Sequence, residues 1–151
     1  MRNFFLAILF TILLNSCGYN SVYKENQNSD FTISSLELNG NDEMNNLVKK
    51  KLERYIGKES EKKFQIKIDT DYFKKPISKD KTGKIQNYKL VTNLYSEIKI
   101  ENKVKNISFS ETFNMQNYTD KFEENKFENK TKNNLTNIML DKIITYLTNY
   151  K

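Results

Sequence analysis

Residues 88–115, YKLVTNLYSEIKIENKVKNISFSETFNM, decide the fold because inward and outward side chains alternate along two consecutive stretches. One side of the first stretch carries Tyr88, Leu90, Thr92, Leu94, Ser96, Ile98 and Ile100. One side of the second stretch carries Ile107, Phe109, Phe113 and Met115. A two-residue turn at Asn102–Lys103 pairs Ile98 with Ile107, Thr92 with Phe113 and Leu90 with Met115, so both apolar sets lie on one face. We therefore predict a β-hairpin with one buried face.

The segment before this hairpin reads as a strand, a helix and a second strand. The first strand spans 31–38 and switches its inward positions between Ile33 and Leu36, which predicts a bulge near Ser34–Ser35. Asn41 or Asp42 caps the helix, and Gly57 ends it. The apolar stripe of this helix is Met44, Leu47, Val48, Leu52, Tyr55 and Ile56. The second strand, 64–72, alternates apolar and polar residues.

The chain from about Asp120 to its end is predicted to be one long helix. Its second half carries a continuous apolar stripe formed by Leu135, Ile138, Met139, Ile143, Tyr146, Leu147 and Tyr150. The element order is strand, helix, strand, strand, strand, helix. A parallel strand–helix–strand unit followed by an antiparallel meander gives an α+β, two-layer sandwich, in which two helices cover one face of a mixed four-stranded sheet.

The N-terminus has the pattern of a lipoprotein signal. Arg2 precedes the apolar run 4–14, FFLAILFTILL, which is shorter than the roughly 20 residues that a membrane-spanning helix needs. The run ends in Leu14-Asn15-Ser16-Cys17, which resembles a bacterial lipobox. We therefore expect a signal peptide at 1–16, a lipid-modified Cys17 that begins a polar tether at 17–30, and a folded domain at 31–151. Several acyl chains on Cys17 would anchor the protein stably in a membrane.

Composition excludes several classes of enzyme and site. The 151 residues include no His and one Cys, so His-based catalysis, Cys-cluster metal sites and internal disulfides are excluded. We expect no metal, no cofactor and no catalytic residues. The rival enzymatic reading would use a carboxylate pair such as Asp69 and Asp71, which alternate outward on one strand as surface residues commonly do. The net charge of +6 suggests nucleic acid, but an exported lipoprotein argues against that partner.

Cys17-Gly18-Tyr19, a short tether, this order of elements and the closing helix together resemble the family of the LPS-assembly lipoprotein LptE, also called RlpB. The resemblance implies an outer-membrane lipoprotein with its domain on the periplasmic side, within or beneath a large β-barrel of the LptD type. It implies that the protein helps this barrel to assemble, plugs it, assists delivery of LPS to the outer leaflet, and binds LPS. The open alternative is an accessory lipoprotein of another envelope lipid-transport complex, which would differ in its partner.

Two sets of residues are candidate contacts for these partners. The outward side of the last strand is polar and uncharged, which suits the polar interior of a large barrel. This set is Asn106, Ser108, Ser110, Thr112, Asn114, Gln116 and Tyr118. The region 74–84 reads as a basic loop that contains the only proline, and its lysines could contact the phosphates of LPS. This second set is Lys74, Lys75, Lys79, Lys81 and Lys84.

Overall fold

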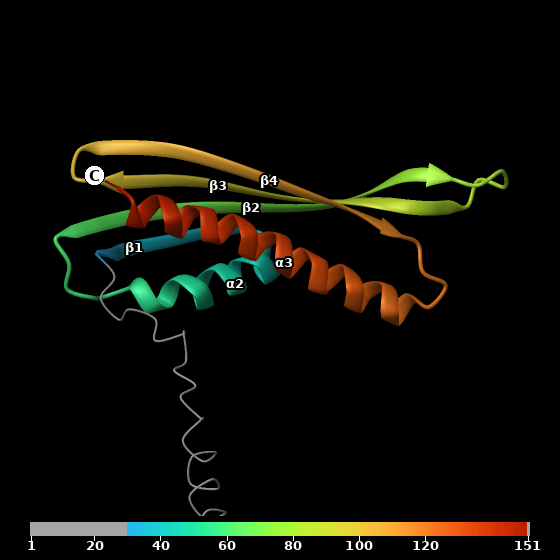
Figure 1. The fold of residues 1–151 in the computed structure, drawn as a ribbon, viewed down its shortest axis with the longest axis horizontal. Coiled ribbons are helices and arrows are strands. Elements are labelled where there is room, and N and C mark those ends of the chain that lie inside the picture. Colours follow the sequence, from blue (N-terminus) through green and yellow to red (C-terminus); the bar gives the residue numbers. More distant parts are fainter. Residues whose placement is uncertain (1–29, 151) are drawn as a thin grey trace, which may run out of the picture.

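A computed structural model of the protein describes residues 30–150; the predicted signal peptide, Cys17 and the tether up to residue 29 lie outside the described residues. The elements follow the predicted order (Figure 1). They are β1 (Phe31–Gly40), α2 (Asp42–Leu52), the short 3₁₀ helix η1 (Glu53–Tyr55), β2 (Lys62–Lys79), β3 (Ile85–Ile100), β4 (Lys103–Gln116) and α3 (Lys121–Thr148). None of the helices in this part of the chain is long and apolar enough to cross a bilayer.

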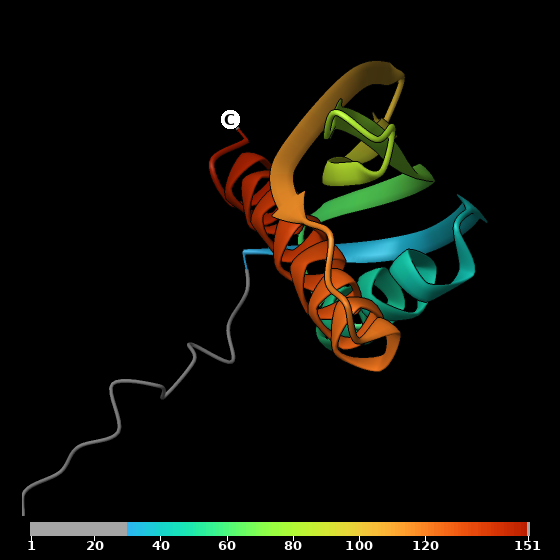
Figure 2. The same cartoon turned by 90° about the vertical axis from the view of Figure 1, so that its right-hand side faces the viewer.

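The sheet has the predicted mixed topology. Its strand order is β1-β2-β3-β4, with β1 and β2 parallel and the other neighbours antiparallel. Helices α2 and α3 cover one face of the strongly curved sheet, and no other element of residues 30–150 covers the opposite face (Figure 2). This arrangement confirms the two-layer α+β fold.

Local signals at the junction of β1 and α2 also behave as the sequence predicts. The register of β1 against β2 shifts between Ile33 and Ser35, at the expected bulge. Asn41 is the N-cap of α2, and its Oδ1 accepts a hydrogen bond from the Met44 amide at 3.1 Å. Gly40 has φ +93°, and a Cβ there would lie 2.0 Å from the Thr70 carbonyl oxygen. Only glycine fits this junction without displacing the backbone.

The hydrophobic core lies between the helices and the β1–β2–β3 part of the sheet. Phe31 stacks on Tyr55 with 4.8 Å between ring centroids and meets Phe64 edge-on at 5.9 Å. The buried cluster comprises Phe31, Ile33, Met44, Val48, Leu52, Phe64, Ile66, Ile68, Leu94, Ile98, Met139, Leu140, Ile143 and Leu147. Most of these are inward positions predicted from alternation and helical periodicity. The predictions for Ile56 and Ile138 are wrong, because both side chains are exposed, and Leu140 of the core lies outside the predicted stripe.

The predicted register of the β3–β4 hairpin is wrong by two residues. The turn is Glu101–Asn102, so Leu90 lies opposite Phe113 and Ile98 lies opposite Lys105. A shift of two residues leaves every side chain on its original face, so alternation alone cannot detect it. The faces are therefore as predicted, although the pairs are not.

The predicted basic loop at 74–84 is also wrong. Strand β2 continues to Lys79, β3 begins at Ile85, and only the residues between them form the turn. The register shifts between Pro76 and Ser78 show how the strand accommodates a proline that cannot donate to the ladder. The turn is closed by Asp80, whose Oδ1 accepts from the amides of Thr82 at 2.8 Å and Lys84 at 2.9 Å.

Candidate binding surfaces

The outward side of β4 forms a polar strip at the edge of the sheet. Six of the seven predicted residues are exposed strand residues: Asn106, Ser108, Ser110, Thr112, Asn114 and Gln116. Tyr118 is different, because β4 ends at Gln116 and the chain turns there toward α3. The ring of Tyr118 is half-buried, with its centroid 5.7 Å from that of Phe127. Tyr118 therefore belongs to the interior rather than to the strip.

The two edges of the sheet differ in how they are covered. At the β1 edge, Ile33 forms an isolated parallel bridge with Ile56, so part of this edge is closed by the chain itself. Strand β4 is the opposite edge, and within residues 30–150 it pairs only with β3. Lys103 and Lys105 lie at one end of β4 and alternate with its outward residues, which are uncharged. An edge strand with an uncharged outward side and free backbone groups is a surface suited to a partner.

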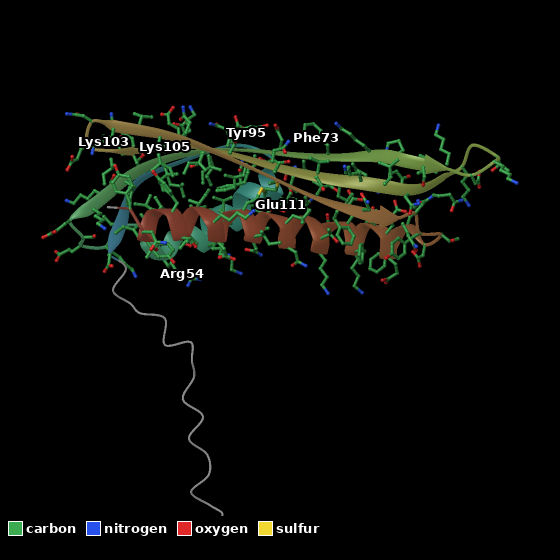
Figure 3. The ribbon with its side chains drawn as sticks, turned by 45° about the horizontal axis from the view of Figure 1, so that its top comes forward. Arg54, Phe73, Tyr95, Lys103, Lys105 and Glu111 are labelled. Atoms are coloured by element: carbon green, nitrogen blue, oxygen red, sulfur yellow. The ribbon has the colours of Figure 1, made fainter. Side chains whose placement is uncertain are left out.

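The outer face also exposes aromatic side chains that the sequence analysis did not single out. Phe73 in β2 is 44% exposed and Tyr95 in β3 is 49% exposed. Both point away from the helices (Figure 3). The signal was present in the sequence, because both residues occupy outward positions of alternating strands, where a polar side chain is usual. The outer face therefore combines these aromatic side chains with the uncharged polar residues of β4 and with charged residues of β2 and β3, such as Asp69 and Glu97.

The five predicted lysines do not gather in one loop. Lys81 and Lys84 lie in the exposed turn, and Lys75 and Lys79 are exposed in β2. Lys75 lies directly opposite Lys89 in β3, which is also exposed and which sequence reasoning missed. Like charges directly opposite each other on neighbouring strands repel, so an anion between them would be stabilising. Four predicted lysines, together with Lys89, are therefore exposed near the β2–β3 turn, where an anion could contact them.

Lys74, the fifth predicted lysine, differs in that it forms ion pairs with α3. Its Nζ lies 2.7 Å from Oε1 of Glu124 and 2.7 Å from Oε2 of Glu128, both in α3. Its inward orientation places this ammonium between two carboxylates, away from the exposed side where a phosphate would bind. The other Glu124 oxygen accepts from Nζ of Lys121 at 2.8 Å.

These ion pairs belong to a polar layer between β2 and the first half of α3. Tyr72 donates a hydrogen bond to Oε1 of Glu128 at 2.7 Å. Burial, and then this hydrogen bond, raise the pKa of Tyr72 far above its ordinary value, so the phenol stays protonated. Nζ of Lys132 lies 5.0 Å from the Tyr72 ring centroid and is ion-paired with Glu43 of α2. This layer is structural, since each charge has a partner inside the fold.

The carboxylates of the rival enzymatic reading lie on the outer face. Asp69 is exposed and Asp71 is half-buried, and they occupy alternate positions of β2. Among residues 30–150, no group of three or more His, Cys, Asp or Glu side chains is arranged to hold a metal ion.

Comparisons with known proteins give the fold. Neither a protein-family model nor a curated protein matches the sequence. The crystal structure of rare lipoprotein B from Shewanella oneidensis is similar with a TM-score of 0.57 and 13% identity, over 77% of this chain and 98% of that chain. A putative lipoprotein from Caulobacter crescentus (TM-score 0.47, 9% identity, 76% and 88% coverage) also matches. So does a lipoprotein B from Nitrosomonas europaea (TM-score 0.47, 12% identity, 80% and 86% coverage). The described domain therefore has the fold of rare lipoprotein B, as the resemblance to LptE implies.

Proposed function

We propose that this chain is a lipid-anchored outer-membrane protein of the LptE type, which binds inside an LptD-type β-barrel, supports its assembly and assists LPS delivery to the outer leaflet. It acts by binding and not by catalysis. The observation that carries the proposal is the uncharged polar strip on the outward side of β4, at the open edge of a sheet with the rare lipoprotein B fold. A large barrel presents a polar interior, and such a strip can hydrogen-bond to it without burying unpaired charges.

The exposed lysines beside the β2–β3 turn support the part of the proposal that concerns LPS. Lys75 and Lys89 face each other across two strands, and Lys81 and Lys84 lie in the adjoining turn. Each lysine near an anionic lipid surface contributes about 1 kcal/mol. This surface would meet the phosphates of LPS, and Lys74 would take no part.

The test is purification of the tagged, lipidated protein from detergent-solubilised outer membrane, with identification of the proteins that co-elute. We expect one large β-barrel in near-equal amount that resists a salt wash. Ser110→Glu and Thr112→Glu place charges on the β4 strip and should each reduce recovery of the barrel. The matched control is Gln65→Glu on the exposed outward side of β2, which should not.

Two results would redirect the proposal. Recovery with an inner-membrane transporter would instead support an accessory lipoprotein of another envelope lipid-transport complex. Recovery of the barrel by the two β4 variants as well as by the unmodified chain would show that the strip is not the interface.

The anchor is tested separately: Cys17→Ala should accumulate as an unprocessed and unlipidated precursor, and normal anchoring of this variant would contradict the lipobox.

A further inference from the structure

A hollow of about 380 Å³ lies on the outer face of the sheet, where β2, β3 and β4 run side by side. Its lining side chains come from two adjacent rows of the sheet. One row is Asp69, Tyr95 and Ser108, and the next is Lys67, Glu97 and Asn106. Ser96 and Ile107 complete the lining. The volume is at the lower end of the range for small-molecule sites.

Tyr95 gives this hollow an exposed aromatic surface. Its side chain is 49% exposed and stands on the face opposite the helices (Figure 3). Ser108 lies directly beside it in β4, and Asp69 lies directly beside it in β2. An aromatic ring with hydrogen-bonding neighbours on both sides can contact an apolar ligand face and satisfy polar groups at the ligand rim.

Most polar side chains around Tyr95 form no short-range contact with the fold, although Glu37, and then the charges of Glu97 and Asp69, raise the pKa of Lys67. Within residues 30–150, the side chains of Tyr95, Asn106 and Ser108 form no hydrogen bond, and Asp69 and Glu97 form neither a hydrogen bond nor an ion pair. Lys67 is the exception, since its Nζ lies 2.9 Å from Oε1 of Glu37 in β1. The hollow therefore offers free carboxylate, amide and hydroxyl groups, chiefly as acceptors.

Charge restricts the class of ligand further. The lining holds two carboxylates and one lysine, and that lysine is already paired with a third carboxylate. The local charge is therefore negative, which disfavours a phosphate or a carboxylate ligand. A neutral ligand with many hydroxyl donors and one apolar face fits these groups best.

We propose that this hollow is a binding site for a neutral sugar ring. The C–H face of a pyranose would stack on Tyr95, and its hydroxyl groups would donate to Asp69 and Glu97 and pair with Asn106. The ligand chemistry has two sources in an envelope: the N-acetylated glycan of the cell wall and the neutral hexoses of the LPS oligosaccharide. The site shares Asn106 and Ser108 with the β4 strip, so a barrel bound there would cover part of it. Sugar binding by the isolated protein does not depend on the barrel.

The test uses the full lipidated chain in a detergent whose headgroup is not a sugar, with saturation-transfer NMR and titration. The probes are tri-N-acetylchitotriose, maltotriose and glucose 6-phosphate. We expect saturable binding of at least one neutral trisaccharide and much weaker binding of the phosphate. Preference for the acetylated probe would indicate cell-wall glycan, and preference for maltotriose would indicate the hexoses of LPS.

Matched variants identify the site. Tyr95→Ala should weaken binding roughly five- to tenfold, the size expected for the loss of a stacked ring, whereas Tyr95→Phe should retain most of it. The control is Phe73→Ala, which removes a similarly exposed aromatic from the same face, outside the hollow. Glu97→Gln should reduce the difference in affinity between maltotriose and glucose 6-phosphate, because it removes one negative charge that repels the phosphate.

The proposal is overturned if no neutral sugar binds saturably, or if Phe73→Ala weakens binding as much as Tyr95→Ala. Equal binding of glucose 6-phosphate would also overturn it. Because these titrations use the isolated protein, they are independent of barrel recovery. A failed sugar titration with normal barrel recovery contradicts only the sugar site, and the reverse result contradicts only the proposed function.

Discussion

Nζ of Lys74 in β2 lies 2.7 Å from a carboxylate oxygen of Glu124 in α3, and both side chains are largely buried. This pair joins the far half of the β2–β3 hairpin to the first half of the last helix. Glu124 also accepts a hydrogen bond from the Tyr118 amide at 3.1 Å, at the chain turn that leads into α3. One carboxylate therefore fixes a strand, a turn and a helix relative to one another.

The first prediction concerns the pH dependence of folding. Burial alone would raise the pKa of Glu124, but the hydrogen bonds from Lys121, Lys74 and the Tyr118 amide lower the pKa to about 2 from its ordinary value of 4.5. A lowered pKa in the folded state means that the carboxylate stabilises the fold fully above pH 4.5. This contribution falls as the pH drops toward about 2, and it is on the order of 2 kcal/mol.

Denaturant unfolding between pH 7 and pH 2 checks this prediction. Glu124→Gln should be less stable than the unmodified chain at pH 7 and should lose less stability on acidification. Glu123→Gln is the matched control, since Glu123 is an exposed neighbour on the same turn. An acid dependence that is unchanged in Glu124→Gln would contradict the assignment.

The second prediction concerns the junction between β1 and α2. Gly40→Ala should cost about 3 kcal/mol or more, because the new Cβ would clash with the Thr70 backbone in a left-handed conformation. Gly57 also has a positive φ, +72°, but a Cβ there meets nothing within 4 Å. Gly57→Ala should therefore cost only about 1 kcal/mol from backbone strain. Thermal unfolding of both variants measures the difference, and equal losses would be inconsistent with the clash.

The third prediction concerns Ser96. Its Oγ is buried on the inward side of β3 and has no hydrogen-bond partner among residues 30–150. Ser96→Ala should stabilise the protein by about 1 kcal/mol, because it removes a hydroxyl that loses water on folding and gains nothing. Ser110→Ala, at an exposed position of β4, should change the free energy of unfolding by less than about 0.5 kcal/mol. Destabilisation by Ser96→Ala would mean that the hydroxyl has a partner.

The fourth prediction concerns the β3–β4 turn. Glu101 has φ +52°, a left-handed conformation that side chains other than Gly and Asn adopt at a cost. Glu101→Gly should stabilise the hairpin by about 1 kcal/mol. Thermal unfolding measures this gain, and Asn102→Gly is the comparison, because only Glu101 has a positive φ in this turn. A larger gain from Asn102→Gly would contradict the observed turn.

Sequence reasoning recovered the features of the fold that leave a periodic or local signal. Alternation identified the buried face of β3, and the inward switch between Ile33 and Leu36 revealed the bulge. Asn41 was identifiable because its side-chain oxygen can accept a hydrogen bond from a free amide in the first turn of a helix. The length of β2 was not predictable, since its far half includes a proline and several lysines, and one of these, Lys74, pairs with Glu124 of α3, 50 residues later in the chain.

The candidate surfaces were predictable to the extent that they follow from strand parity. The outward residues of β4 from Asn106 to Gln116 lie where parity places them, but Tyr118 lies past the end of the strand. Lys74 could not be distinguished from its exposed neighbours, because its partners are in another element. The hollow around Tyr95 was not predictable either, since it needs the register of three strands at once.

The length of strand β2 determines how far the domain extends. It has 18 residues, from Lys62, which is the partner of Phe31, to Lys79 beside the turn. At about 3.3 Å per residue it spans roughly 60 Å, which exceeds the roughly 40–45 Å thickness of a bilayer with its headgroups. In Figure 1 the start of β1 and the β2–β3 turn lie at opposite ends of the domain. The proposed function places the lipid anchor in the periplasmic leaflet. From there, a domain of this length would carry Lys81 and Lys84 to the level of the opposite leaflet.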